Sequence, residues 1–244
     1  RALNVFLFGR LQSPLLWDVC SITAYLTGST LYLYLPLIPD IAILRDLCRD
    51  WRKPLYDLLS FGWSGTKEEI RVLEKCIAVM AIIVIPVAIS VHTVVSYVFS
   101  MTVQPMWHST IFGPYFVVGA IFSGIAALII AMAALRRVYR LEEFLRPIHF
   151  KNLGLLLLVM SCLWLYFTFS EFLTTWYGND PEHIVIFYSK LTGPYAPFFW
   201  TMVATCFVIP FSVLASPLGN TVRGTVIASF PVLLGMWLER FLIV

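Results

Sequence analysis

Five ionisable side chains interrupt long apolar stretches of the sequence: Asp18, His92, Glu171, Glu239 and Arg240. An ionisable group inside a membrane is costly, so each one requires a partner or a function. Carboxylate and imidazole groups beside an apolar slot suit a quinol, because they accept hydrogen bonds from its hydroxyls and take the protons released on oxidation. The pattern therefore predicts proton chemistry at membrane depth, with a quinol as the substrate class.

Each of these side chains also has a structural interpretation. Glu239 and Arg240 are neighbours that could form an interfacial salt bridge or extend to the membrane surface. His92 could be a hydrogen-bonded packing residue, and Asp18 lies where a carboxylate stabilises the start of a helix. Glu171 has a packing alternative too, so the sequence leaves both interpretations open.

Six apolar runs must position these groups. A helix needs about 20 apolar residues to cross the roughly 30 Å of hydrocarbon in a bilayer. The runs cover residues 15–38, 76–99, 112–135, 153–176, 195–215 and 224–244. We expect an all-α polytopic transmembrane helix bundle of about six spanning helices, forming a single membrane domain over residues 1–244.

Composition excludes soluble and nucleic-acid-binding classes. The 244 residues are 59% hydrophobic and 13% charged, with a formal net charge of only +3. Five cysteines without a CxxC pair predict no zinc, iron–sulfur or covalent haem site. Among four histidines only His92 lies inside an apolar run, so a bis-histidine haem is not expected. We expect a chain that lies in a lipid bilayer and carries no metal or haem of its own.

Basic residues gather in two connections, and cytoplasmic loops are the ones that retain positive charge. They are Arg45, Arg49, Arg52, Lys53, Lys67, Arg71 and Lys75 in the first, and Arg136, Arg137, Arg140, Arg146 and Lys151 in the second. The 100–111 connection has none, and 177–194 has only Lys190. We expect the 40–75 and 136–152 connections to be cytoplasmic and the five ionisable side chains to lie in the outer half of the membrane, where they could line one cavity.

Short sequence patterns predict further details of these helices and their connections. The 68–75 segment is amphipathic and predicts a solvated or interfacial helix within the 40–75 connection. Pro86 and Pro210 predict kinks, and Gly119 and Gly124 allow close helix packing. Because the chain begins at Arg1 rather than Met, we expect an internal stretch of a longer protein.

Eight short segments together carry a resemblance to a known family. They are SPLLWDV at 13–19, LIPD at 37–40, SVHTVVS at 90–96, WHSTIF at 107–112, PYFV at 114–117, GAIFSG at 119–124, TGPY at 192–195 and GMWLERFLIV at 235–244. In this order the sequence resembles the polysulfide-reductase-like (NrfD) membrane subunits, most closely the two large membrane subunits of bacterial alternative complex III.

The resemblance implies a subunit of a quinol:electron-acceptor oxidoreductase in the bacterial inner membrane, within a respiratory or photosynthetic complex. It implies a quinol of menaquinone type near the periplasmic face, with Asp18, Trp17 and Arg10 as its binding residues and Asp18 and His92 as catalytic groups. Electrons would pass to a periplasmic iron–sulfur subunit. A paralogous membrane subunit and cytochrome c subunits complete the implied complex, whose partners carry the iron–sulfur clusters and haem.

The resemblance further suggests a proton route through His92, Glu171, Glu239 and Arg240. Two departures from the family pattern favour an alternative. A histidine expected just before Gly9-Arg10 is absent, and Tyr97 follows Ser96 where an acid is often found. Loss of both groups fits a diverged complex, or a paralogue that binds no quinol and anchors the complex, conducts protons, or does both.

A solute transporter is the third hypothesis. Transporters of that kind carry Gly- or Pro-interrupted half-helices at matching places in two repeats. The sequence shows no such pair, so this class is disfavoured.

Overall fold

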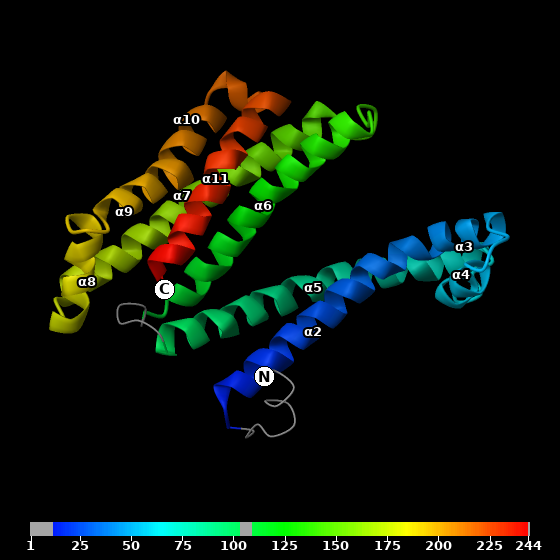
Figure 1. The fold of residues 1–244 in the computed structure, drawn as a ribbon, viewed down its shortest axis with the longest axis horizontal. Helices are drawn as coiled ribbons and strands as arrows, with labels where there is room; N and C mark the ends of the chain where they lie inside the picture. The colour runs from blue at the N-terminus through cyan, green and yellow to red at the C-terminus, as the bar shows by residue number, and fades with distance from the viewer. Residues whose placement is uncertain (1–11, 103–108, 244) are drawn as a thin grey trace. The chain divides into compact units, whose positions relative to one another are not determined.

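The computed structural model describes residues 12–102 and 109–243. In these residues every regular element is a helix, and six helices are long and apolar enough to cross a membrane. Figure 1 shows the helices in chain order. The spanning candidates are Leu16–Leu47, Lys67–Val98, Phe112–Val138, Pro147–Gly178, Ala196–Leu214 and Val222–Ile243. The predicted all-α polytopic fold is confirmed.

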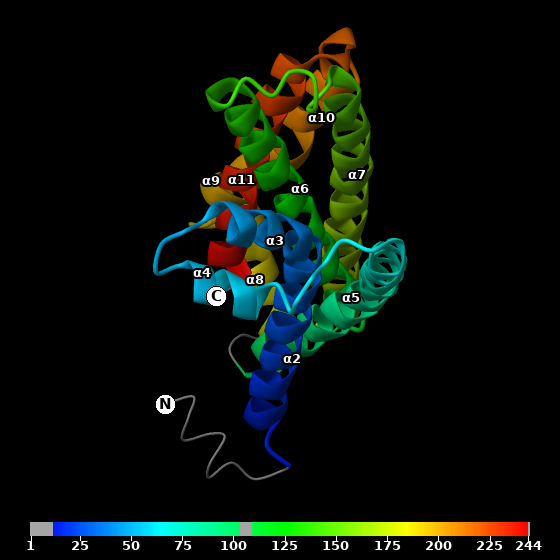
Figure 2. The same ribbon diagram turned by 90° about the vertical axis from the view of Figure 1, so that its right-hand side faces the viewer.

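The chain forms two compact units, residues 1–95 and 96–244. The first unit holds α2 (Pro14–Tyr34), a 3-10 turn (Leu35–Leu37), α3 (Ile38–Leu47) and α4 (Lys53–Leu59). α3 and α4 pack against each other (Figure 2). Arg45 fixes this connection, because its guanidinium donates to Ser60 Oγ at 3.2 Å and to the Trp63 carbonyl at 3.2 Å. The predicted 40–75 connection is therefore largely helical.

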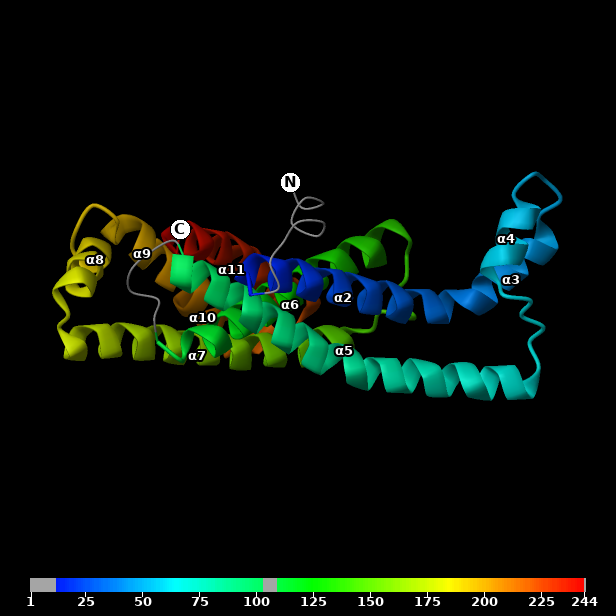
Figure 3. The same cartoon turned by 90° about the horizontal axis from the view of Figure 1, so that it is seen from below.

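The helix α5 (Lys67–Thr102) has 36 residues and runs without interruption past Pro86 (Figure 3). Thr66 and Glu69 start it with a capping box: the Thr66 hydroxyl accepts from Glu69 N at 3.3 Å, and Glu69 Oε2 accepts from Thr66 N at 3.1 Å. At 1.5 Å per residue the helix is about 54 Å long, well beyond the hydrocarbon thickness. The amphipathic 68–75 segment is thus the first two turns of the spanning helix rather than a separate element.

The second unit contains the packed core. Its elements are α6 (Phe112–Val138), α7 (Pro147–Gly178), α8 (Pro181–Leu191), α9 (Ala196–Val203), a π-helical segment (Ala204–Val208), α10 (Ile209–Leu214), a 3-10 turn (Pro217–Asn220) and α11 (Val222–Ile243). α11 lies against α6, α9 and α10, and α6 lies against α7. The apolar core is formed by buried side chains of these helices, among them Phe112, Phe122, Trp164 and Val232.

Glycines set the close helix contacts of this unit. A Cβ at Gly119 would lie 2.9 Å from Met236 Cε, and one at Gly235 would lie 2.4 Å from Cys206 Sγ. A Cβ at Gly235 would also lie 3.2 Å from the Cys206 backbone nitrogen, so a side chain there would separate α11 from the π-helical segment. The atoms nearest Gly119, in contrast, are the ends of the flexible Met236 and Arg240 side chains. Gly119 lies at such a close contact, whereas no atom of the described residues lies within 4 Å of the Cβ position of Gly124, so its packing role stays a prediction.

The backbone around Pro210 is irregular. Pro210 is the second residue of α10, the helix that directly follows the π-helical segment. Proline has no N–H to donate, and a π turn is one way in which a helix absorbs that lost bond. The same segment faces Gly235 of α11, so the irregular backbone and the closest helix approach coincide.

Candidate functional site

A sharp turn between α7 and α8 begins the candidate site. Asn179 ends α7 in the left-handed conformation, with φ of 48°. Asp180 then caps α8 by accepting a hydrogen bond from Glu182 N at 3.3 Å, and Pro181 takes the first helical position. These three consecutive residues end one helix and start the next without an intervening loop.

A second tight turn connects α8 to α9. The amides of Thr192 and Gly193 both donate to the Tyr188 carbonyl, at 3.0 and 2.9 Å. A Cβ at Gly193 would lie 2.7 Å from the Ser189 backbone, so only glycine fits here. Trp200 Nε1 of α9 donates to the Leu191 carbonyl at 3.1 Å. The short helix α8 is held at both ends, which presents Phe187 and Lys190 on its buried face.

Four charged side chains meet at this end of the second unit: Glu171, Lys190, Glu239 and Arg240, here called the charged cluster. Glu171 and Glu239 are each 1% exposed and Lys190 is 7% exposed. Glu171 continues a stripe of buried α7 residues spaced three and four apart, which is the spacing of one helix face. That stripe is Phe150, Gly154, Leu157, Ser161, Trp164, Thr168 and Glu171.

Glu239 is held from two helices. Trp164 Nε1 on α7 donates to Glu239 Oε1 at 2.6 Å. Arg240 Nη1 lies 3.2 Å from Glu239 Oε2, and the Arg240 guanidinium stacks over the Phe116 ring at 4.1 Å from its centre. The Arg240 side chain is 33% exposed. Glu239 and Arg240 therefore form the predicted ion pair, but its carboxylate is in the core rather than at an interface.

Glu171 has one satisfied and one unsatisfied oxygen. The Ser109 hydroxyl donates to Oε2, while Oε1 is buried and accepts no hydrogen bond within the described part of the chain. The hydroxyls of Thr174 and Thr175 bond to the backbone carbonyl of Glu171 instead, at 2.9 and 3.0 Å. Glu171 Oε1 is thus an acceptor available to a further donor.

Lys190 is the positive group near Glu171. Burial lowers the pKa of Lys190 from 10.5 to about 8, and the Glu171 carboxylate opposes part of that shift because it favours the charged ammonium. A lysine with this pKa loses its proton at a markedly lower pH than an ordinary lysine does.

A small cavity connects the two halves of the charged cluster. Its lining includes Tyr115, Lys190 and Glu239, with Phe172 and Phe199 as apolar walls. The space open to a water centre is about 10 Å³, which is near the minimum that one water molecule needs. Polar groups from α6, α8 and α11 therefore face one water-sized space.

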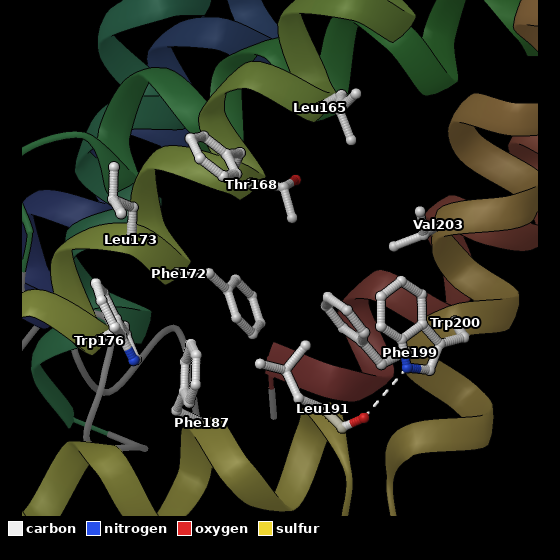
Figure 4. A pocket seen from close by; sticks show the side chains of 11 residues that line it. Leu165, Thr168, Phe172, Leu173, Trp176, Phe187, Leu191, Phe199, Trp200 and Val203 are labelled. Atoms are coloured by element: carbon white, nitrogen blue, oxygen red, sulfur yellow. Dashed lines mark hydrogen bonds between the residues drawn. The ribbon is translucent and has the colours of Figure 1, made fainter.

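An apolar pocket of about 330 Å³ lies beside this cavity, among α7, α8 and α9 (Figure 4). It is lined by Leu165, Thr168, Phe169, Phe172, Leu173, Trp176, Phe187, Leu191, Phe199, Trp200 and Val203. The polar atoms of Thr168 and Trp200 are already bonded to backbone carbonyls, at 2.8 and 3.1 Å. Apart from the indole N–H of Trp176 the rest of the lining is apolar, so the pocket suits a group that is mostly hydrocarbon. Phe172 and Phe199 belong to both the pocket and the cavity, with ring centres 4.8 Å apart.

Asp18 and His92 belong to the first unit. Asp18 Oδ1 on α2 is buried and accepts no hydrogen bond from any described residue, whereas Trp17 beside it is 58% exposed. His92 Nδ1 lies 2.7 Å from the Ala88 carbonyl, and its ring meets Tyr25 edge-on at 5.8 Å. Arg10, the other predicted quinol residue, lies outside the described residues. The roles of all these residues stay predictions.

Lys190 and Trp164 belong to the site but were not predicted as site residues from the sequence. Lys190 entered it only as a loop charge, although the cap signals at 179–181 and the Gly-Pro pair at 193–194 bound a short helix. Trp164 looked like an ordinary apolar residue of a span. In the residues that the structure describes, no three His, Cys, Asp or Glu side chains are grouped to hold a metal ion.

Comparison with known proteins adds one match. A family model described as "Polysulphide reductase, NrfD" matches residues 1–244, the whole chain. No curated protein matches the sequence.

Proposed function

Because the chain belongs to the polysulphide reductase NrfD family, we propose that it is a membrane subunit of a quinol-oxidising electron-transfer complex. In this proposal it lies in the bacterial inner membrane, binds a menaquinone-type quinol near the periplasmic face, and resembles the large membrane subunits of alternative complex III. Electrons pass to a periplasmic iron–sulfur subunit. A paralogous membrane subunit and cytochrome c subunits are the other partners.

The observation that carries the proposal is the buried, unbonded oxygen of Asp18 within an apolar helix. Asp18 Oδ1 accepts no hydrogen bond from the described residues, and a buried acceptor of this kind fits the hydroxyl of a quinol. Oxidation of a quinol releases two electrons and two protons. Asp18 would hold one hydroxyl and accept its proton, Trp17 would pack against the ring, and Arg10 and His92 would complete the site.

Substitution of Asp18 tests this role. Asp18→Asn keeps the shape of the side chain and removes its capacity to accept a proton as a carboxylate. In the purified, assembled complex we expect quinol turnover to fall about 100-fold or more, as for other general bases, with reduced quinone occupancy. Asp40→Asn is the matched control, because Asp40 is exposed on α3. Unchanged turnover in the Asp18 variant would refute quinol oxidation at this site.

A second candidate function is favoured by the charged cluster. A non-quinol paralogue that anchors the complex and conducts protons needs buried titratable groups, and Glu171, Lys190 and Glu239 supply them in the second unit. Tyr97 stands where the family often has an acidic residue, and this replacement also favours the second candidate. Normal turnover of Asp18→Asn together with lost proton movement in Glu171→Gln would select this candidate.

A further inference from the structure

We propose that Lys190 exchanges protons between the two buried carboxylates of the second unit, Glu171 and Glu239. The inference deepens the proton-conducting role and rests on the proposed function only for the source of the protons. It assigns a function to Lys190, the one member of the charged cluster that comes from a connection between spans rather than from a spanning helix.

The helix α8 holds Lys190 in the core of the second unit. Lys190 lies on α8, which the caps at 179–181 and the turn at 192–195 hold rigidly at both ends. It is 7% exposed, and Phe187 is buried one turn earlier on the same face of the helix. A lysine on an unconstrained loop would extend its ammonium into water, since burying a charge is costly. The backbone here directs the side chain into the core instead.

Lys190 has charged and polar neighbours from three other helices. Glu171 comes from α7 and is close enough to affect the protonation of the amine. Glu239 from α11 and Tyr115 from α6 share the water-sized cavity with Lys190. The residues of α9 that line the cavity, Phe199 and Met202, are apolar. Lys190 therefore has one carboxylate as a charge neighbour and a second one across the cavity.

Arg240 and Lys190, the two cations of the charged cluster, differ in how readily they lose a proton. Arg240 stays protonated in proteins and already neutralises Glu239 at 3.2 Å. Glu171 has a serine hydroxyl on one oxygen and an unbonded second oxygen. The lowered pKa of Lys190, about 8, leaves both forms of the amine accessible near neutral pH. Lys190 can thus lose its proton without leaving Glu239 unpaired.

Proton transfer from Lys190 to a carboxylate breaks one bond and forms one bond. An N–H bond of the Lys190 ammonium breaks and an O–H bond of a carboxyl group forms, so a neutral amine and a neutral acid replace two charges. Protonation of the amine from the other carboxyl group reverses the step. The cavity that Lys190 and Glu239 share has space for about one water molecule, through which the proton would pass, and the Ser109 hydroxyl bonds to Glu171. No electron moves in either direction.

Two substitutions separate proton exchange from a structural role of the positive charge. Lys190→Arg keeps a cation in the cluster but cannot deprotonate, because the pKa of arginine exceeds about 12. Lys190→Met removes the charge and keeps most of the volume. Lys151→Met is the control, since Lys151 is exposed at the start of α7.

The first measurement is proton movement by the whole complex in proteoliposomes, followed with a pH-sensitive dye during quinol turnover. We expect Lys190→Arg and Lys190→Met both to slow proton transfer about tenfold or more, and Lys151→Met to match the wild type. Wild-type proton movement in Lys190→Arg would overturn the proposal, because the charge alone would then be sufficient.

The second measurement needs no quinol. Infrared difference spectra of the purified full-length chain between pH 6 and pH 10 report protonated carboxyl groups. We expect a carboxyl signal that titrates with Lys190 in the wild type, disappears in Lys190→Arg and persists in Lys151→Met. The same titration in Lys190→Arg as in the wild type refutes the exchange. Absence of quinol turnover in the wild-type complex would count against the proposed function and leave this test intact.

Discussion

The polar groups of the two units are satisfied in different ways. In the first unit the hydroxyls of Thr23, Thr27 and Thr93 and the ring of His92 bond to carbonyls four residues earlier in their own helices. Such bonds form in any helix and do not depend on its neighbours.

The second unit adds polar bonds between segments that are far apart in the sequence. Trp164 donates to Glu239 across 75 positions of sequence, Ser109 to Glu171 across 62, and Ser161 to the Cys206 carbonyl across 45. The Trp164 and Ser161 bonds exist only if two helices have the correct rotation and register, and the Ser109 bond joins α7 to the segment that precedes α6. The comparison indicates that polar bonds between spanning helices help to specify the tertiary structure of the second unit, whereas in the first unit the polar bonds between elements, from Arg45 and Tyr34, lie at and beyond the end of α2.

The largest expected effect comes from removing a bond between helices. Glu239→Ala leaves the Trp164 N–H without its acceptor and Arg240 without its ion-pair partner, at 2.6 and 3.2 Å in the wild type. We expect a loss of about 3–5 kcal/mol in unfolding free energy. Denaturant unfolding of the full-length chain in detergent measures it.

Glu142→Ala is the control, because Glu142 is exposed in the 139–146 connection. Its unfolding free energy is expected to stay within about 0.5 kcal/mol of the wild type. Glu239→Gln keeps an acceptor for Trp164 and should lie between the two. A cost below about 1 kcal/mol for Glu239→Ala would break the proposed contrast between the units.

The next effect concerns packing in the second unit. Gly235→Ala places a methyl group 2.4 Å from both Cys206 Sγ and Thr205 Oγ1, so α11 must move away from the π-helical segment. We expect a loss of about 1–3 kcal/mol in the same unfolding measurement.

Gly124→Ala is a matched substitution on α6, where no atom of the described residues lies within 4 Å of the new methyl group. It should be neutral or stabilising by up to about 1 kcal/mol, since alanine is the better helix former. Equal effects of the two substitutions would show that the close approach at Gly235 contributes nothing to the fold.

A smaller effect follows from the pKa of Lys190. The folded pKa of about 8 lies below the value of 10.5 expected for an unfolded lysine, so the unfolded chain holds more protons between these values. The burial penalty is complete below pH 8, and stability rises as the pH increases from about 8 toward 10.5. The slope cannot exceed about 1.4 kcal/mol per pH unit for one group.

Melting temperatures of the wild type and Lys190→Met across pH 7 to 10 measure this effect. We expect the wild type to gain stability with pH relative to Lys190→Met, with Lys151→Met following the wild type. Parallel curves for the wild type and Lys190→Met would mean that Lys190 keeps its ordinary pKa in the folded chain.

The sequence predicted the spanning helices because each is an apolar run of the length that a bilayer requires. It also predicted that Glu171, Glu239 and Arg240 lie in the outer half of the membrane; in the structure Glu171 and Glu239 are both buried in the second unit, and Glu239 pairs with Arg240. Their partners could not be predicted, because helix rotation depends on contacts such as Gly119 against Met236 that no local pattern encodes.

Lys190 was missed for a different reason. Its helix has 11 residues and connects two spans, so a search by length and hydropathy passes over it. The signals that define the helix are local: Asn179, Asp180 and Pro181 at its start and Gly193 at its end. A search for capped short helices between spans would have found it, and its spacing to Phe187 would have placed Lys190 on the buried face.

The smallest expected effect is in the first unit. His92→Phe removes the bond from Nδ1 to the Ala88 carbonyl, at 2.7 Å, while a benzene ring keeps the edge-on contact with Tyr25 at 5.8 Å. The Ala88 carbonyl also accepts the bond of its own helix, so it keeps a donor. We expect a change below about 1 kcal/mol in unfolding free energy. A loss of the size predicted for Glu239→Ala would mean that His92 fixes the tertiary structure of its unit, and the contrast between local and cross-helix polar bonds would fail.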